Sequence, residues 1–225
     1  MDQKDLEGVR EAAGDYRFLL DRGYPEQSVR KLVGDRYALS REERLILYRG
    51  VCSTATAIRR RSRLIPAAAL EGELLFLDFY NLAFTIINYR LGRPLFLSTD
   101  GLLRDAGALH GRLGRQERLS WVLDPLVSTL GELQVSRVEV AFDAPVSHSA
   151  EHAARLRQAA SGRRFSLTAE LLDSADYPLR HARKGILATA DSAIIDASHL
   201  PVFDLAAYLL RTTYAFEPAD LAALL

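Results

Sequence analysis

The residues of this sequence best able to do chemistry are aspartates that directly follow short apolar runs. Leu74–Leu77 runs into Asp78, and Asn81 comes three residues later. Val138–Phe142 runs into Asp143 in the same way. Carboxylate and amide oxygens are ligands that hard divalent cations prefer, and such a cation can activate water against a phosphodiester.

The same pattern occurs twice more in the C-terminal half of the chain. Leu171-Leu172 runs into the segment that ends at Asp176, and Ile186–Thr189 is followed by Asp191. Each aspartate alone is also typical of a helix cap or a turn, and that interpretation stays open for each. Four successive apolar runs that each end in an aspartate are harder to explain by capping alone.

The elements that must position these aspartates are predicted as alternating strands and helices. Strands are predicted at Leu74–Leu77, Pro94–Ser98, Val138–Phe142, Phe165–Leu172, Ile186–Thr189 and Val202–Phe203. The clearest helices between them are predicted at Arg115–Leu133 and Ser147–Ala160. This alternation predicts an α/β fold with a parallel sheet covered on both faces. Sites in such sheets lie at the carboxyl ends of the strands, which is where the aspartates stand.

Repulsion between these aspartates indicates that a cation binds among them. Two carboxylates about 4 Å apart repel by about 4 kcal/mol at an effective dielectric constant of about 20. Three or four of them without a cation would raise some pKa values or destabilise the fold. Mg²⁺ or Mn²⁺ would resolve the conflict, and Asn81 fits a neutral group that holds a metal-bound water or orients Asp78.

Motifs of several other α/β chemistries are absent from the sequence. It contains no Gly-x-Gly-x-x-Gly of dinucleotide-binding folds, no phosphate-binding loop ending in Gly-Lys-Ser/Thr and no Gly-x-Ser-x-Gly nucleophile elbow. A phosphoaspartyl phosphatase would need an acid two residues after Asp78, where Tyr80 stands.

Taken together, the motifs resemble the PIN-like superfamily, especially its NYN branch, over roughly residues 72–205. The motifs are Leu-Asp78-Phe-Tyr-Asn81-Leu, Phe-Asp143, Ser-Ala-Asp176 and Ala-Thr189-Ala-Asp191-Ser192-Ala-Ile. The resemblance implies a Rossmann-like sheet of the PIN-like type and Mg²⁺- or Mn²⁺-dependent RNA cleavage. It also implies metal ligands at Asp78, Asp143, Asp176 and Asp191, with Asn81 in the catalytic set. The full chain is also similar to an uncharacterised prokaryotic family with a helical N-terminal part.

One departure from the PIN-like pattern is the long segment between the first helix and the strand that ends at Asp143. It contains Asp100-Gly101, which is a turn signal, and then Asp105. A plain loop is the favoured interpretation. The alternative, that Asp100 or Asp105 joins the site, stays open because the loop follows a predicted strand.

The first 65 residues are predicted as a separate helical domain, followed by the α/β domain over 66–225. Three helices joined by tight turns are expected, the second at 25–33 and the third opened by a capping box at Ser40 and Glu43. The third helix is expected to run through Val51, with Ile58 as its furthest end. Such a unit resembles a helix-turn-helix, although many three-helix units bind nothing.

Charge distribution supplies the candidate nucleic-acid contacts. The chain has 29 basic and 29 acidic residues, so its net charge does not indicate a nucleic-acid partner, but the first 65 residues carry 14 basic and 10 acidic side chains. The candidate contacts are Arg59, Arg60, Arg61 and Arg63. A solvated linker is the favoured interpretation of this run, and a phosphate-contacting strip is the alternative.

The remaining signals concern the compartment and two weaker sites. A lone cysteine, Cys52, predicts a reducing, cytoplasmic setting, and no apolar run is long enough to span a membrane. His148 and His152 have the spacing of a zinc pair, but a solvated helix face is favoured. Phe79 and Tyr80 are interpreted equally well as base-stacking or as packing residues.

Three hypotheses about function follow. The first is a metal-dependent endoribonuclease, with RNA as the expected partner and DNA left open. The second is an inactive PIN-like module that binds RNA or protein, and the third is a helix-turn-helix regulator. The sequence favours the first, because a degenerate nuclease is expected to lose acids and this chain has all four motif positions.

Overall fold

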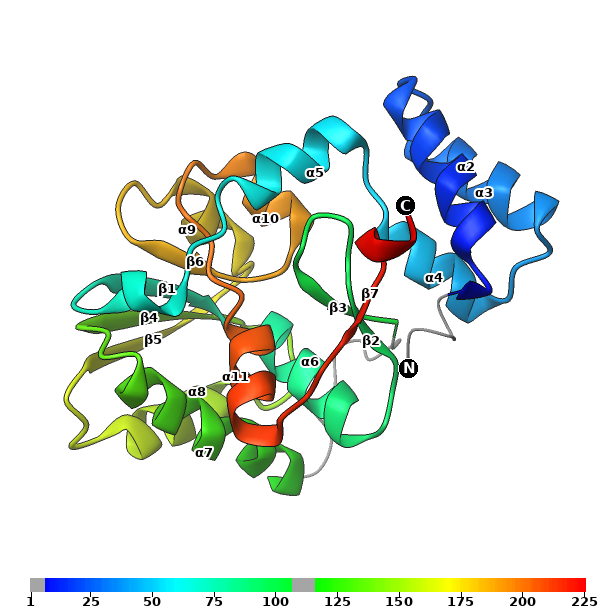
Figure 1. Ribbon diagram of the computed structural model, residues 1–225. Coiled ribbons are helices and arrows are strands. Elements are labelled where there is room, and N and C mark those ends of the chain that lie inside the picture. Colours follow the sequence, from blue (N-terminus) through cyan, green and yellow to red (C-terminus); the bar gives the residue numbers. More distant parts are fainter. Residues whose placement is uncertain (1–6, 107–115) are drawn as a thin grey trace. The chain divides into compact units, whose positions relative to one another are not determined.

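The structure is a computed structural model that describes residues 7–106 and 116–225 (Figure 1). Its contacts divide the chain into two compact units. Unit 1 comprises Met1–Ser62, Leu91–Ala108 and Glu217–Leu225, and unit 2 comprises Arg63–Arg90 and Leu109–Phe216. The sequence-based division at residue 65 assigned residues 91–108 and 217–225 to the α/β domain, whereas the structure groups them with the helices of unit 1.

The N-terminal part of unit 1 is helical, and serine side chains cap two of its helices. The helices are α2 (Arg10–Asp21), α3 (Glu26–Arg36), α4 (Arg41–Gly50) and α5 (Thr54–Arg61). The predicted capping box is confirmed, since Glu43 N donates to Ser40 Oγ at 3.3 Å and Ser40 N donates to Glu43 Oε2 at 2.7 Å. The prediction of one helix towards Ile58 is wrong. Val51 is extended, and Ser53 caps α5 by accepting a hydrogen bond from Thr56 N.

A small sheet explains why two later segments join unit 1. It consists of β2 (Leu95–Leu97), β3 (Leu103–Asp105) and β7 (Ala219–Asp220), in the order β3-β2-β7. One buried apolar cluster contains side chains of the helices together with Phe96 of β2 and Leu221, which follows β7. The helices therefore bury their apolar faces against segments distant in sequence, because burial of apolar surface is the main favourable term in folding. The predicted Asp-Gly turn is confirmed between β2 and β3, with Gly101 at a φ of 84°.

Unit 2 is built on a parallel sheet of four strands. These strands are β1 (Leu74–Asp78), β4 (Arg137–Asp143), β5 (Ser166–Leu172) and β6 (Ile186–Ala188), in the order β5-β4-β1-β6. The α/β class and the parallel sheet are thus confirmed. The run predicted as a strand at Val202–Phe203 forms two isolated bridges instead, from Val202 to Leu64 and to Leu187.

Helices alternate with the strands of unit 2. They are α6 (Phe79–Arg90), α7 (Gln116–Glu132), α8 (Ser149–Ala160), α9 (Asp176–His181), α10 (Ser192–Ala197) and α11 (Leu205–Tyr214). In Figure 1, α7, α8 and α11 lie below the sheet, and α9 and α10 lie above it. Short 3₁₀ helices occur at Ala67–Leu70 and Ala222–Leu224. None of the helices in the described ranges is both long enough and apolar enough to cross a membrane.

Candidate active site

The ends of the two neighbouring strands β1 and β6 are joined by side-chain hydrogen bonds. Asp78, the last residue of β1, accepts a bond from Asn81 N at 3.2 Å and another from Thr189 Oγ1 at 3.1 Å. The side-chain oxygen of Asn81 accepts a bond from Ala190 N at 2.8 Å. Asn81 therefore orients Asp78 through its backbone amide and holds the segment after β6 through its side chain.

Asp191 combines a capping role with a place at the same edge of the sheet. Its carboxylate caps α10 by accepting bonds from Ala193 N at 2.7 Å and Ile194 N at 3.2 Å. Its own backbone N–H donates to Thr189 Oγ1 at 3.1 Å. Thr189 thus connects Asp78 with Asp191. Sequence reasoning quoted this threonine within a motif but did not assign it to the site, although its position two residues before Asp191 was a usable signal.

Asp143 and Asp176 form the other half of the site. Asp143, at the end of β4, accepts a bond from Ala175 N at 2.8 Å, which places the start of α9 beside the end of that strand. Asp176 is the first residue of α9 and forms an ion pair with Arg180 at 2.5 Å. Both carboxylates are half-buried. Sequence reasoning missed Arg180, although its spacing of four residues from Asp176 on a helix is typical of an ion pair.

Electrostatic effects connect the two halves. Asp78 is only 7% exposed, and burial raises its pKa to about 7, with further increases from the charges of Asp191 and Asp143. Burial also raises the pKa of Asp176; Arg180 opposes this increase, and the charges of Asp191 and Asp143 add to it. The four aspartates therefore act on one another at one edge of the sheet.

The donor set fits a hard divalent cation by its chemistry. Asp78, Asp143 and Asp191 form no ion pair with any residue of the described ranges, and Asp176 alone of the four has a cationic partner. Within those ranges, no group of three or more acidic, histidine or cysteine side chains is already arranged around one point that could hold an ion. The site thus has the ligand types and the unbalanced negative charge for a metal, while in the described ranges its side chains are not arranged around a single ion position.

The aromatic residues beside Asp78 are packing residues. Phe79 is fully buried and stacks on Phe142 with ring centroids 4.2 Å apart. The hydroxyl of the buried Tyr80 forms a hydrogen bond with His152 Nδ1 at 3.1 Å. The exposed aromatic residue next to the site is Tyr177 on α9, which is 70% exposed.

This hydrogen bond corrects the expectation that His148 and His152 form a solvated helix face. His148 is exposed, but His152 is buried and its pKa is lowered by that burial. The sequence could not reveal the partner, because Tyr80 is 72 residues away in the chain.

The arginine run at residues 59–63 is not a continuous strip. Arg60 is buried in unit 1 and binds Asp100 at 2.8 Å. Arg63 of unit 2 donates to the backbone carbonyl of Leu200 at 2.9 Å. Arg60 is therefore buried away from any ligand, and all three guanidinium nitrogens of Arg63 donate to the carbonyls of Leu200 and Ile195, so a role for these two arginines in phosphate binding is not supported. Arg59 and Arg61 are exposed on α5, which also replaces the expected linker with a helix.

Asp100 and Asp105, the two aspartates of the long intervening segment, are each bound by arginine within unit 1. Asp100 is 1% exposed, and its carboxylate binds both Arg60 and Arg104. Burial favours its protonated form, but Arg104, Arg60 and a hydrogen bond from Ser98 keep the pKa of Asp100 below its usual value. Asp105 forms an ion pair with Arg49 at 3.0 Å.

Comparison with known proteins identifies two families. The family described as "Domain of unknown function (DUF5616)" matches residues 67–208, and the one described as "Protein of unknown function (DUF434)" matches residues 9–63. The "Uncharacterized protein MJ0935" of Methanocaldococcus jannaschii is 26% identical over 194 residues, which cover 85% of this chain and 91% of that protein. No solved structure matches the chain.

Proposed function

We propose that this chain, which belongs to the DUF5616 family, is a metal-dependent ribonuclease whose active site is the carboxyl edge of the sheet in unit 2. One observation carries the proposal. Three of the four aspartates at this edge have no cationic partner in the described ranges, and one of the three is buried between neutral donors. A protein keeps uncompensated negative charge of this kind at a cost in stability, and such sites are commonly functional.

Each side chain has a role in this proposal. Asp78, Asp143, Asp176 and Asp191 would hold Mg²⁺ or Mn²⁺. The bound ion would supply positive charge to the attacked phosphate and acidify a water molecule. Thr189 and Asn81 fix the direction of the Asp78 carboxylate through the hydrogen bonds that join β1 to β6.

Two neighbouring side chains suit the binding of RNA at this edge. Arg180 holds Asp176 at the start of α9 and brings a guanidinium group, which binds phosphate oxygens well. Tyr177 presents an exposed ring directly after Asp176, and exposed aromatic rings stack on unpaired bases. RNA is the substrate that the resemblance to PIN-like nucleases implies, and DNA is the alternative substrate.

A second candidate function is an inactive module that binds RNA or protein through the same fold. The observation that favours it is the ion pair between Asp176 and Arg180, which neutralises one of the four expected ligands. In such a module, the arginine would have replaced the metal as the source of positive charge.

Cleavage of labelled single-stranded RNA and DNA by the full chain, with and without Mn²⁺ or Mg²⁺, tests the proposal. We expect metal-dependent RNA cleavage that falls by about a hundredfold or more in Asp78→Asn, because loss of a group that only orients a metal ligand already costs about 10- to 100-fold, and Asp78 would itself be a ligand. Asp124→Asn on α7 is the matched control, since Asp124 is an exposed aspartate outside the site, and it should cleave normally.

Metal binding is measured separately by the melting temperature. A cation that binds only the folded state raises the melting temperature, because it stabilises that state by about 2.7 kcal/mol at a hundredfold excess over the dissociation constant. We expect an increase in the wild type and in Asp124→Asn, but not in Asp78→Asn. An increase without cleavage of either nucleic acid would favour the second candidate. Cleavage that survives Asp78→Asn would refute the site.

A further inference from the structure

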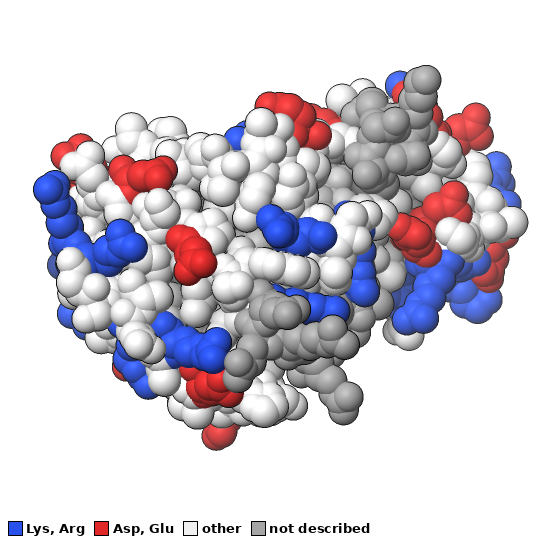
Figure 2. All heavy atoms as spheres, turned by 90° about the horizontal axis from the view of Figure 1, so that it is seen from below, with Lys and Arg blue, Asp and Glu red and all other residues white. Residues whose placement is uncertain are grey.

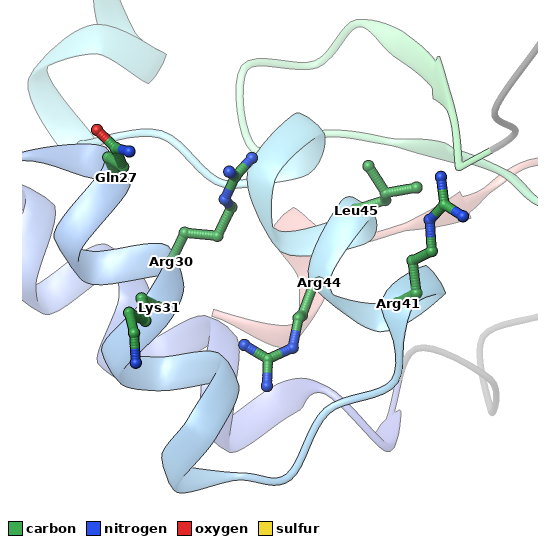
Figure 3. A pocket seen from close by; sticks show the side chains of 6 residues that line it. All are labelled: Gln27, Arg30, Lys31, Arg41, Arg44 and Leu45. Atoms are coloured by element: carbon green, nitrogen blue, oxygen red, sulfur yellow. The ribbon is translucent and has the colours of Figure 1, made fainter.

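Unit 1 contains a cavity of about 570 Å³ between α3 and α4. Its lining residues are Gln27, Arg30 and Lys31 of α3, and Arg41, Arg44 and Leu45 of α4 (Figure 3). Here four of the six lining side chains are cationic, so the chemistry of the pocket is that of an anion site.

The positive charge in this pocket is only partly neutralised. Lys31 and Arg44 share one acid, Asp35, at 2.8 and 2.9 Å. Arg30 and Arg41 form no ion pair with a residue of the described part of the chain, although Glu26 is close enough to Arg30 to interact with its charge. The pocket therefore carries more positive than negative charge within a small volume.

A glycine on α3 leaves room for the guanidinium group of Arg44 in the pocket. A Cβ atom at Gly34 would lie 2.1 Å from Nη1 of Arg44, so the guanidinium group occupies the space that a side chain would take. Its Nε donates to the carbonyl of Leu39 at 3.0 Å, and its Nη2 donates to Asp35. In Figure 3, Arg30 extends from α3 toward α4, and Arg44 extends from α4 toward α3.

An exposed aromatic ring lies beside the cations. Tyr48 is one helical turn after Arg44 and Leu45 on α4, and it is 43% exposed. The guanidinium carbon of Arg30 lies 4.8 Å from the centroid of its ring. Cationic groups for the backbone next to an aromatic surface for a base are the combination that binds single-stranded nucleic acids.

We propose that this pocket holds the backbone of single-stranded RNA, with Arg30, Arg41 and Arg44 on its phosphates and Tyr48 stacked on a base. The identity of the nucleic acid rests on the proposed function, for which the pocket would be a substrate-holding site separate from the catalytic aspartates. A local pocket suits a chain of zero net charge, and on the face shown in Figure 2 the basic side chains form separate groups with acidic ones between them.

Fluorescence anisotropy of the full chain with labelled oligouridylate in EDTA measures this binding without metal-dependent cleavage. Each phosphate contact contributes about 0.7 to the slope of log affinity against log salt for a single strand. In the variant Arg30→Gln/Arg41→Gln, we expect this slope to fall by about 1.4 and the affinity at low salt to fall roughly tenfold. Arg22→Gln, which removes an exposed cation beyond the end of α2, is the matched control and should change neither quantity.

Three further variants separate geometry from charge. Gly34→Ala keeps every charge but displaces the Arg44 guanidinium, and we expect the folded variant to bind RNA more weakly. Tyr48→Ala should weaken binding with an unchanged salt slope, because it removes stacking and no charge, whereas Tyr48→Phe should bind as the wild type does.

Competition identifies the anion. Unlabelled oligouridylate should displace the probe, while poly-glutamate and inorganic phosphate at equal charge should not. Displacement by poly-glutamate, tighter binding of duplex DNA than of RNA, or full affinity in Arg30→Gln/Arg41→Gln would each overturn the proposal. Asp124→Asn, which lies outside both sites, should bind oligouridylate as the wild type does. Binding of oligouridylate by the wild type without metal-dependent cleavage would mean that the proposed nuclease function has failed, whereas cleavage by the wild type together with full affinity in Arg30→Gln/Arg41→Gln would mean that the pocket proposal has failed.

Discussion

Asp100 in unit 1 and Asp78 in unit 2 are both buried aspartates, one shortly after β2 and the other at the end of β1, yet their surroundings differ in charge. The carboxylate of Asp100 binds two arginines, and its pKa is held below the usual value. The carboxylate of Asp78 receives hydrogen bonds from neutral donors and lies near two other acids, and its pKa is raised to about 7.

The difference shows how partners decide the role of a buried carboxylate. An ionised group in a protein interior is tolerated when it is paired and hydrogen-bonded. Unit 1 supplies both cations, Arg60 and Arg104, from its own residues, so the carboxylate of Asp100 has a structural role there. Unit 2 provides Asp78 with hydrogen bonds but no cation from the described residues, which leaves its charge to be balanced by a ligand or a proton.

The largest effect is expected from the variant Asp100→Asn. It leaves Arg60 and Arg104 buried without their counter-ion, and breaking a buried ion pair in this way costs about 3–5 kcal/mol. Urea unfolding of the full chain measures the loss. Asp105→Asn is the control, because its partner Arg49 is more exposed, and it should cost less. Equal losses in the two variants would show that burial does not distinguish the two ion pairs.

A gain of stability is expected from Asp78→Asn without metal. Because folding raises the pKa of Asp78 from about 4 to about 7, the folded state binds an extra proton between these values, and its stability falls as the pH rises through them. A neutral amide avoids this loss, so the variant should gain roughly 2–4 kcal/mol above pH 7 and almost nothing near pH 4.

Thermal unfolding of the wild type and of Asp78→Asn across this pH range measures the gain, with Asp124→Asn as the control. A pH-independent difference between the two proteins would mean that the carboxylate is not protonated on folding, which would remove the contrast with Asp100.

The smallest effect is expected from Thr189→Val. It removes the hydroxyl that donates to Asp78 and accepts from Asp191 N, and loss of such bonds costs about 1–3 kcal/mol. The pKa of Asp78 should rise further, because one of the hydrogen bonds that lower it is lost. Thr189→Ser keeps the hydroxyl and should restore both quantities. Equal destabilisation by the serine variant would indicate a packing role for the threonine methyl group.

The strands of the parallel sheet could be predicted because their signal is carried within three to seven neighbouring residues. The run at Pro94–Ser98 was also predicted as a strand, and β2 lies there, but it belongs to the other sheet. An apolar run indicates that a strand is buried and does not indicate against which partner. The assignment of residues 91–108 to unit 1 depended on a core that only long-range packing creates.

The sequence by itself determined features that involve neighbouring residues: the capping box at Ser40, the Asp100-Gly101 turn and the aspartate at the end of β1. These depend on backbone geometry over a few residues, which local side chains control. Only the tertiary structure decided which aspartates meet a cation.

Arg60 is 40 residues from Asp100, and Thr189 is 111 residues from Asp78. A buried charge is stabilised or left unbalanced by groups within a few ångströms in space, and the folding of the whole chain decides which groups those are.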